Sequence, residues 1–243
     1  MEKENIRQFR ERLIPLYKSM IEATKEVTQN YDTIKFCMQW GEKFPVNSNE
    51  GLLFVGRANN GWETSSDDVN VLFNEDTTNP ETAFNREDQM SWMQEQFENK
   101  GYACKSPFLW SIRHIAEEYY DDSWWEHIAW SNLCKIAPAA GNNPNESLYD
   151  AQLEQASLIL KEEIRFLSPR FVIMFTREDW ANPFIDAIAE NETLEVLEKM
   201  EWSGYENKVY LIDGVYYIVT EHPARKPYLS QVEAICNIID KYK

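Results

Sequence analysis

The stretch LYDAQLEQASLILKEEIRFLSPRFVIMFT, residues 148–176, decides the fold class of this chain. Its first part carries apolar residues at steps of four and three from Tyr149 to Leu167, which predicts an amphipathic helix facing a core. Pro169 ends that helical pattern. The continuous β-branched and aromatic run at 170–176 then predicts a strand covered on both faces. A helix that leads into a fully buried strand is typical of an α/β protein with a parallel sheet.

The remaining sequence repeats this alternation of helices and strands. The segment KVYLIDGVYYIVT, residues 208–220, predicts two strands joined at Asp213-Gly214, a dipeptide that favours a two-residue hairpin turn. Further helices are predicted at 106–120, with Ser106 as N-cap and Pro107 in the first turn, at 183–200, and from about Ser230. The predicted fold is therefore a three-layer α/β/α sandwich with a mainly parallel four-stranded central sheet. Its strands are expected near 51–56, 128–132, 171–175 and 215–220, with 208–212 beside the last.

Residues 1–45 are predicted to be an N-terminal helical extension. Apolar residues from Ile6 to Val27 fall on one helical stripe, and Pro15 interrupts it, so we expect a kinked helix or two short helices. Residues 62–90 are polar, acidic and rich in Asn, which predicts a long loop. No internal repeat and no Pro/Gly/Ser linker divides the chain, and residues 1–243 are predicted to form a single domain.

The composition limits the partners that this chain can have. Its 41 acidic and 24 basic residues give a formal net charge of −17. Since affinity for nucleic acid comes largely from phosphate neutralisation by Lys and Arg, binding to bulk duplex DNA should be weak. The first residues lack a signal-peptide core, and no apolar run approaches the ~20 residues of a membrane helix. We therefore expect a cytoplasmic protein without membrane contact.

The four cysteines do not predict a metal or iron–sulfur site. They are far apart in the sequence and form no C-x-x-C pair, whereas metal ligands normally come in pairs at short spacing. Free thiols in a reducing compartment are the expectation. We predict no metal ligand and no cofactor.

Polar and basic residues recur directly after the predicted strands. In open α/β sheets the ligand crevice lies outside the carboxyl ends of the strands, so these residues should share one edge. They are Arg57, Asn59 and Asn60 after the first strand, Asn132 and Lys135 after the second, Thr176 and Arg177 after the third, and His222, Arg225 and Lys226 after the last. Each of them alone could simply end a strand. Together they favour a site for a phosphate-bearing or otherwise anionic ligand.

Three motifs carry a resemblance to a known family. WSNLCKIAPAAGNNP, residues 130–144, resembles the central motif of uracil-DNA glycosylases, especially the iron–sulfur type of many bacteria and archaea. The matching positions are Asn132, Lys135, Pro138 and Pro144. TEHPARKP, residues 220–227, resembles the closing His-Pro-Ala or His-Pro-Ser motif, and LLFVGRANNGWE, residues 52–63, resembles the opening strand-Gly motif. The resemblance covers roughly residues 50–240.

The resemblance implies a function and a set of site residues. The family hydrolyses the N-glycosidic bond of uracil flipped out of DNA. Carried over, Asn132 would read the base edge and His222 would donate to the base oxygen where negative charge develops. Asn59 and Glu63 become candidates for the catalytic group that holds the attacking water. Substrate contacts are expected from Arg57, Asn60, Lys135 and Arg225, alongside Asn132.

The opening motif differs from the family pattern, and it leaves two functions open. Arg57 stands where the iron–sulfur type carries an acid, Asn59-Asn60 replace Pro-Gly, and the cluster cysteines are absent. One hypothesis is nucleobase recognition with N-glycosidic bond hydrolysis. The other is a catalytically inactive member of the fold that binds a nucleotide or a protein partner, which the charge of −17 favours. The expected ligand contains a nucleobase or nucleotide, single-stranded DNA included; the oligomeric state stays open. Residues 56–61 should bind an anion or base rather than activate water.

Overall fold

The computed structural model describes residues 2–60, 64–73, 90–120, 122–190 and 194–243. A mixed seven-stranded sheet with the order β2-β4-β3-β6-β9-β8-β7 forms its centre. The strands are β2 (Gln39–Trp40), β3 (Leu52–Ala58), β4 (Ile128–Cys134), β6 (Phe171–Met174), β7 (Glu198–Trp202), β8 (Tyr205–Ile212) and β9 (Val215–Val219). β3 is parallel to β4 and β6, and β6 is parallel to β9. The pairs β2–β4, β8–β9 and β7–β8 are antiparallel.

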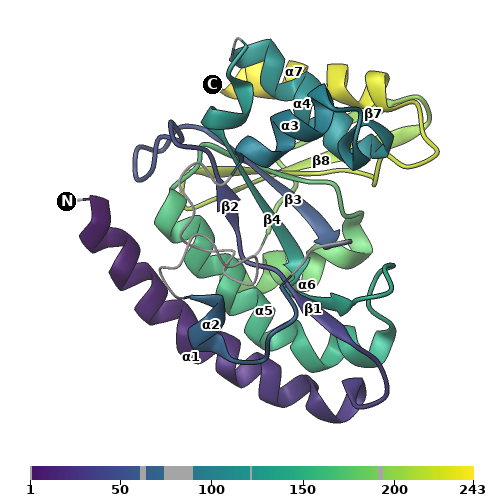
Figure 1. The fold of residues 1–243 in the computed structure, drawn as a ribbon. Helices are drawn as coiled ribbons and strands as arrows, with labels where there is room; N and C mark the ends of the chain where they lie inside the picture. The colour runs from purple at the N-terminus through teal and green to yellow at the C-terminus, as the bar shows by residue number, and fades with distance from the viewer. Residues whose placement is uncertain (1, 61–63, 74–89, 121, 191–193) are drawn as a thin grey trace.

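Helices cover both faces of this sheet, which makes the fold α/β (Figure 1). One face packs against α1 (Glu2–Thr28), α5 (Glu146–Leu167) and α6 (Glu178–Ala189). The other packs against α3 (Ser91–Glu98), α4 (Pro107–Tyr119) and α7 (Tyr228–Tyr242). The short elements are α2 (Val69–Leu72), η1 (Tyr102–Lys105), η2 (Trp124–His127), and β1 (Thr33–Lys35), which pairs antiparallel with β5 (Ile136–Pro138). No helix in the described ranges is long and apolar enough to cross a membrane.

The sequence of β6 shows why its apolar run is continuous. Val172 and Met174 belong to the core beneath α5, whereas Phe171 and Ile173 belong to the core beneath α4 and α7. All four side chains are buried, because successive residues of a strand point to opposite faces and both faces are covered. The prediction of a strand covered on both faces is confirmed here.

Local signals at helix starts and turns are also confirmed. The Ser106 hydroxyl accepts a hydrogen bond from the Leu109 amide at 3.3 Å, so it caps α4 as predicted. Asp213 and Gly214 have φ angles of 50° and 80° and join β8 to β9. Both angles are positive, as the favoured two-residue hairpin turn requires.

Two predictions about the extent of elements are wrong. The strand predicted at 208–212 beside the last is β8, but the sheet has seven strands and is mixed, because the antiparallel strands β2 and β7 extend it at its two edges. The predicted helix at 183–200 is α6 followed by a strand. α6 begins earlier and ends at Ala189, where Glu190 takes a left-handed conformation with φ 52°. Residues 198–202 instead pair with β8 as the edge strand β7.

The N-terminal segment agrees with its prediction only in part. Of the two predicted alternatives, two short helices are excluded, because α1 continues through Pro15 as one helix with Phe9, Leu13 and Tyr17 buried along it. Phe9 stacks on Phe166 of α5 with ring centroids 4.1 Å apart, and this packing offsets the hydrogen bond that proline removes. Within 1–45, β1 and β2 also form, and β2 pairs with β4 at the edge of the sheet. In the predicted loop at 62–90, residues 69–72 are helical, while 62–63 and 74–89 lie outside the described residues.

Candidate functional site

A cavity of about 390 Å³ lies at the carboxyl ends of β3 and β4, and we call it the strand-end pocket. It gathers residues from five separate segments of the chain. The wall is made by Gly56, Arg57, Ala58, Asn59, Asn60, Ser106, Pro107, Phe108, Leu109, Trp130, Asn132, Asn142, Asn143, His222 and Ala224. Five of the eight predicted site residues are therefore together, namely Arg57, Asn59, Asn60, Asn132 and His222.

Asn132 is held in the pocket by its neighbour on the adjacent strand. Parallel pairing places Gly56 of β3 opposite Asn132 of β4. A Cβ atom on Gly56 would lie only 2.4 Å from the Asn132 Oδ1 atom, so a glycine is required for this side chain to lie against β3. The residue is 1% exposed, and its Nδ2 donor is buried without a hydrogen-bond partner. The amide oxygen thus packs against β3, while the amide nitrogen makes no hydrogen bond with the described residues.

Asn59 is the second amide of the pocket whose hydrogen bonds are not made. It is 1% exposed, and both its Oδ1 and its Nδ2 atoms are buried without a partner. An unmade hydrogen bond at a buried polar group costs about 1–3 kcal/mol, and native proteins pair nearly all such groups. Two unsatisfied amides in the wall of one cavity indicate a binding site for a molecule with complementary donors and acceptors.

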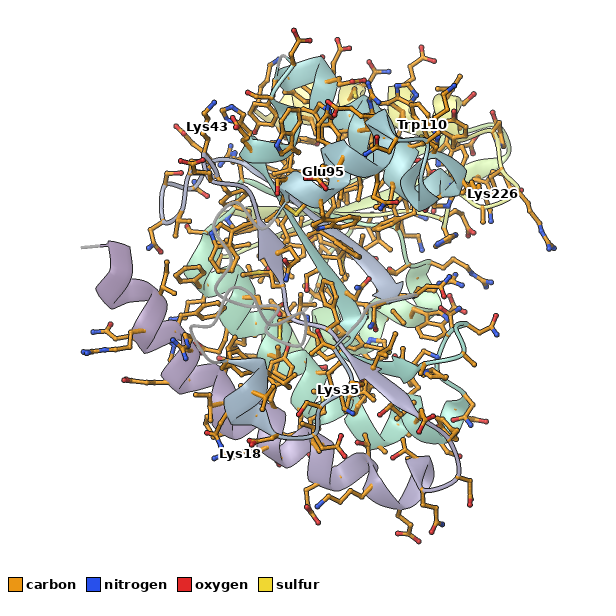
Figure 2. All side chains as sticks on the ribbon, in the orientation of Figure 1. Lys18, Lys35, Lys43, Glu95, Trp110 and Lys226 are labelled. Atoms are coloured by element: carbon orange, nitrogen blue, oxygen red, sulfur yellow. The ribbon has the colours of Figure 1, made fainter. Side chains whose placement is uncertain are left out.

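His222 enters the pocket as a neutral hydrogen-bond donor. Burial, with the nearby charges of Arg57 and Lys226, lowers the pKa of its imidazole to about 4. Its Nδ1 atom accepts a hydrogen bond from the Ala224 amide at 3.2 Å, so in the neutral ring the proton is on Nε2. Its ring lies nearly parallel to that of Phe108, with centroids 6.3 Å apart and 15° between the planes. Lys226 lies toward the periphery (Figure 2).

Arg57 is the cation in the wall of the pocket. Its Nε atom donates to the Thr176 carbonyl at 2.8 Å, and its guanidinium carbon lies 5.3 Å from the centroid of the Trp180 ring. Within the described part of the chain, no carboxylate forms an ion pair with it. Burial and the charge of Arg177 lower the pKa of Arg57. A backbone contact and a ring contact fix the guanidinium in place, and no described carboxylate contacts it to neutralise its charge.

Lys135 is not in the pocket, and its predicted substrate contact is corrected. Its Nζ atom is fully buried and donates to the Ser131 hydroxyl and to the Glu163 carboxylate, both at 2.7 Å. Burial lowers the pKa of Lys135 and raises that of Glu163. The long side chain turns back beneath β4 toward α5, so it stabilises the interior rather than the edge of the sheet.

Two further predicted residues are not part of the pocket wall as far as it is described. Arg225 is exposed, has a φ of 61°, and does not line the pocket, although its neighbour Ala224 does. Glu63 lies outside the described residues. Their predicted roles stay predictions.

The sequence interpretation missed several residues of the wall, of which Phe108 and Trp130 are the largest. Ser106 and Pro107 marked the start of α4 correctly, but no local pattern indicated that this start faces the ends of β3 and β4. Asn142 and Asn143 belong to the loop whose motif was recognised, and the spacing of that motif drew attention to its prolines instead. The adjacent positions in the AGNNP segment were the available signal.

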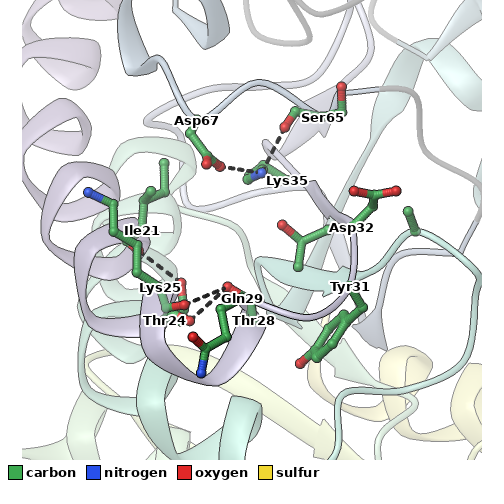
Figure 3. Close-up of a pocket in the computed structure, with 12 residues that line it drawn as sticks. Ile21, Thr24, Lys25, Thr28, Gln29, Tyr31, Asp32, Lys35, Ser65 and Asp67 are labelled. Carbon is green, nitrogen blue, oxygen red and sulfur yellow. Dashed lines mark hydrogen bonds and ion pairs between the residues drawn. The ribbon is translucent and has the colours of Figure 1, made fainter.

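A second cavity, which we call the α1 groove, is larger at about 580 Å³ and lies between the end of α1, β1 and residues 65–67 (Figure 3). Its buried cation, Lys35, donates to the Ser65 carbonyl at 2.7 Å and pairs with Asp67 at 2.5 Å. The Thr24 hydroxyl donates within α1 to the Met20 carbonyl at 3.0 Å. The Tyr31 hydroxyl is buried without a partner. Apart from the Tyr31 hydroxyl, the polar side chains of the groove described here thus have partners in the protein.

No arrangement of His, Cys, Asp and Glu side chains that could hold a metal ion occurs in the described ranges. All four cysteines are free, and Cys37 and Cys134 are buried. Burial raises the pKa of each of these two thiols to about 12, so neither is poised as a thiolate ligand or nucleophile.

No protein-family model matches this chain, and a search of curated proteins finds no match either. The functional argument therefore depends on the geometry of the strand-end pocket and on its chemistry.

Proposed function

We propose that the strand-end pocket binds a nucleobase and that this chain is a uracil-DNA glycosylase-like protein. The observation that carries the proposal is the meeting of Asn132 and His222 in one cavity, each with a hydrogen-bond donor that no described residue accepts. The parallel run β4-β3-β6-β9 within the sheet supports it, because the motifs that resemble the family follow the carboxyl ends of three of these parallel strands, β3, β4 and β9. So does the ring of Phe108, which offers an apolar surface for a planar ligand.

The pocket chemistry suits recognition of an oxygen-bearing base. A neutral imidazole with its proton on Nε2 donates to a base oxygen without presenting a full charge. If the N-glycosidic bond breaks, negative charge moves onto the base, and the same donor stabilises it. The Nδ2 atom of Asn132 adds a second donor, while Asn59 offers a donor and an acceptor together.

A binding role without catalysis is the second candidate, and the pocket wall favours it in one respect. Hydrolysis needs a group that orients or deprotonates the attacking water. Among the described residues, no carboxylate lines the pocket, and the residue directly after Gly56 is the cation Arg57. Asn59 is then the group that remains to hold a water. In this alternative, the chain is a catalytically inactive member of the fold that binds a nucleotide.

Excision and binding assays on the same protein separate the two candidates. The substrate is a single-stranded oligonucleotide with one uracil, at low salt, and release of free base is measured together with nucleoside binding. Release that disappears in His222→Gln and Asn132→Ala, but persists in the control His114→Gln, supports the hydrolase. Binding without release, lost in the same two variants, supports the binding module. If the protein neither binds the nucleoside nor releases the base, the proposal is overturned.

A further inference from the structure

We infer that the ligand of the strand-end pocket is a free mononucleotide whose phosphate binds Arg57, rather than a base within a polynucleotide. This inference rests on the proposed function, because it takes the base to lie against Asn132 and His222. Its new content is the anionic group, the residue that receives it, and the size of the ligand.

Arg57 has the properties of an anion receptor. One of its N–H groups, on Nε, is used by the Thr176 carbonyl, and the Trp180 ring stacks near the guanidinium plane. These contacts fix the side chain, so little conformational entropy is lost when it binds. The outer N–H groups remain available, since no described carboxylate pairs with them. Charge-assisted bonds from guanidinium to phosphate are among the strongest hydrogen bonds in proteins, and the more so where water is partly excluded.

The neighbouring cations are already neutralised by carboxylates. Arg177 lies 3.2 Å from Asp179 and 4.0 Å from Glu221, and Lys226 lies 3.2 Å from the same Glu221. Lys208, nearby on β8, pairs with Glu178 at 2.6 Å. At this edge of the described structure, the cations left without an ion pair are Arg57 in the pocket wall and, outside the wall, the exposed Lys105 and Arg225.

This distribution of charge distinguishes a mononucleotide from a polymer. Single-strand binding proteins carry a positively charged groove that follows several phosphates. Here one fixed cation faces the cavity, and the chain as a whole has a net charge of −17, which repels every further phosphate. A ligand with one phosphate group therefore matches a pocket with one cation, Arg57, in its wall.

The dimensions of the pocket agree with a ligand of this size. Its volume of about 390 Å³ lies at the lower end of the range usual for small-molecule sites. Its wall contains amides, an imidazole and a guanidinium, which are groups that can bind a polar-edged ring and an anion.

Calorimetric titration of the full chain tests the inference. The ligands are the nucleosides of the four common bases together with uridine, and uridine 5′-monophosphate. Inorganic phosphate alone and a ten-residue single-stranded DNA are titrated as well. We expect a 5′-monophosphate to bind about tenfold or more tightly than its nucleoside. Arg57→Gln should remove that advantage by weakening the binding of the monophosphate more than that of the nucleoside, and Arg57→Lys should keep part of it. The control Arg165→Gln, whose side chain is 73% exposed on α5, should change neither affinity.

The outcomes separate this inference from the proposed function. Equal affinity for nucleoside and monophosphate, or an advantage that survives in Arg57→Gln, would overturn the inference and leave nucleobase binding intact. Tighter binding of the oligonucleotide than of every mononucleotide would assign the phosphate to a polymer and also overturn it. Binding of none of the nucleosides or nucleotides would reject the proposed function itself. Thermal unfolding of each variant ensures that a lost affinity is not a lost fold.

Discussion

The two faces of β4 treat polar side chains in opposite ways. Toward α5, Ser131 and the following Lys135 both donate to the Glu163 carboxylate, and all three are buried. Toward α4, Asn132 is equally buried, yet its Nδ2 atom has no partner. On the α5 side the buried donors of Ser131 and Lys135 are both accepted, and only the Glu163 Oε1 atom has no partner among the described residues, whereas a donor that serves a ligand remains unsatisfied until the ligand binds. Ser131 and Asn132, which are adjacent on β4, thus have different roles. The Ser131 donor is used within the fold, and the Asn132 donor is available to a ligand.

The α1 groove shows that this distinction matters more than size. It is the larger cavity, but Lys35 is already bound by Ser65 and Asp67, as the cation on the α5 side of β4 is bound by Glu163. Arg57 in the smaller strand-end pocket has no such ion pair with the described residues. Hydrogen-bond satisfaction, rather than volume, therefore identifies the candidate site.

The largest effect is expected when the buried ion pair between Lys135 and Glu163, on the α5 side of β4, is removed. Lys135→Met leaves the Glu163 carboxylate buried without its cation, so the free energy of unfolding should fall by about 3–5 kcal/mol. Urea denaturation measures this loss. The double variant Lys135→Met/Glu163→Leu removes both charges and should recover much of the stability. A stable Lys135→Met protein with impaired ligand binding would return Lys135 to the site.

The next effect tests the contact between β3 and β4 at the pocket. Gly56→Ala places a Cβ atom 2.4 Å from the Asn132 Oδ1 atom, so Asn132 must move, at a cost of about 1–3 kcal/mol, and ligand binding should be lost. In the double variant Gly56→Ala/Asn132→Ala the clash with the amide is gone, and only a 3.2 Å approach to the Phe108 ring remains. Thermal unfolding should then return close to the wild-type temperature while binding stays absent. Unimpaired binding by Gly56→Ala would show that the position of Asn132 is not critical.

A matched pair of asparagine substitutions sharpens the contrast between ligand-binding and structural amides. Asn132→Ala should weaken ligand binding by about 1–3 kcal/mol and leave stability unchanged or slightly higher, since it removes an unsatisfied buried donor. Asn145→Ala should do the reverse. Asn145 caps α5 by accepting from the Leu148 amide at 2.9 Å, and losing this cap costs about 1 kcal/mol of stability. The same signature for both variants would abolish the distinction.

Sequence patterns predicted the strand ends well because backbone rules decide them. Asn132 and His222 could be placed at one edge of the sheet, since parallel strands deliver their carboxyl ends to the same side. Lys135 could not be placed, because its position after β4 does not reveal whether a long flexible side chain reaches the edge or turns back toward Glu163. Phe108 was missed for a related reason. Its local pattern fixed the start of α4, but only the tertiary packing puts that start beside β3 and β4.

The errors in element boundaries have the same origin. Apolar periodicity continued past Ala189, yet residues 198–202 form an edge strand because β8 offers them hydrogen-bonding partners. Pro15 left open a division into two short helices, which the packing of Phe9 and Tyr17 against the rest of the core overrides. In both cases a long-range contact outweighs a local propensity.

The smallest expected effect is a change in the titration of His222. Burial is the main cause that lowers the pKa of this imidazole to about 4, and the charges of Arg57 and Lys226 add to it. NMR titration of the histidine ring protons should therefore show His222 neutral down to about pH 4. Arg57→Gln removes one of the lowering charges, so the pKa should rise, but by less than burial lowers it.

The same pKa determines how His222 contributes to stability. The unfolded chain binds a proton to this imidazole below about pH 6.5, whereas the folded protein binds it only near pH 4. Folding stability therefore falls as the pH decreases from 6.5 to 4, and the contribution of His222 is constant above 6.5. His222→Gln should flatten this part of the pH profile, while His114→Gln, with a third of its side chain exposed, serves as the control. If His222 instead titrates near 6.5, the strand-end pocket is well hydrated in solution. Its imidazole would then be partly charged at neutral pH, and a phosphate would have a second cation to bind beside Arg57.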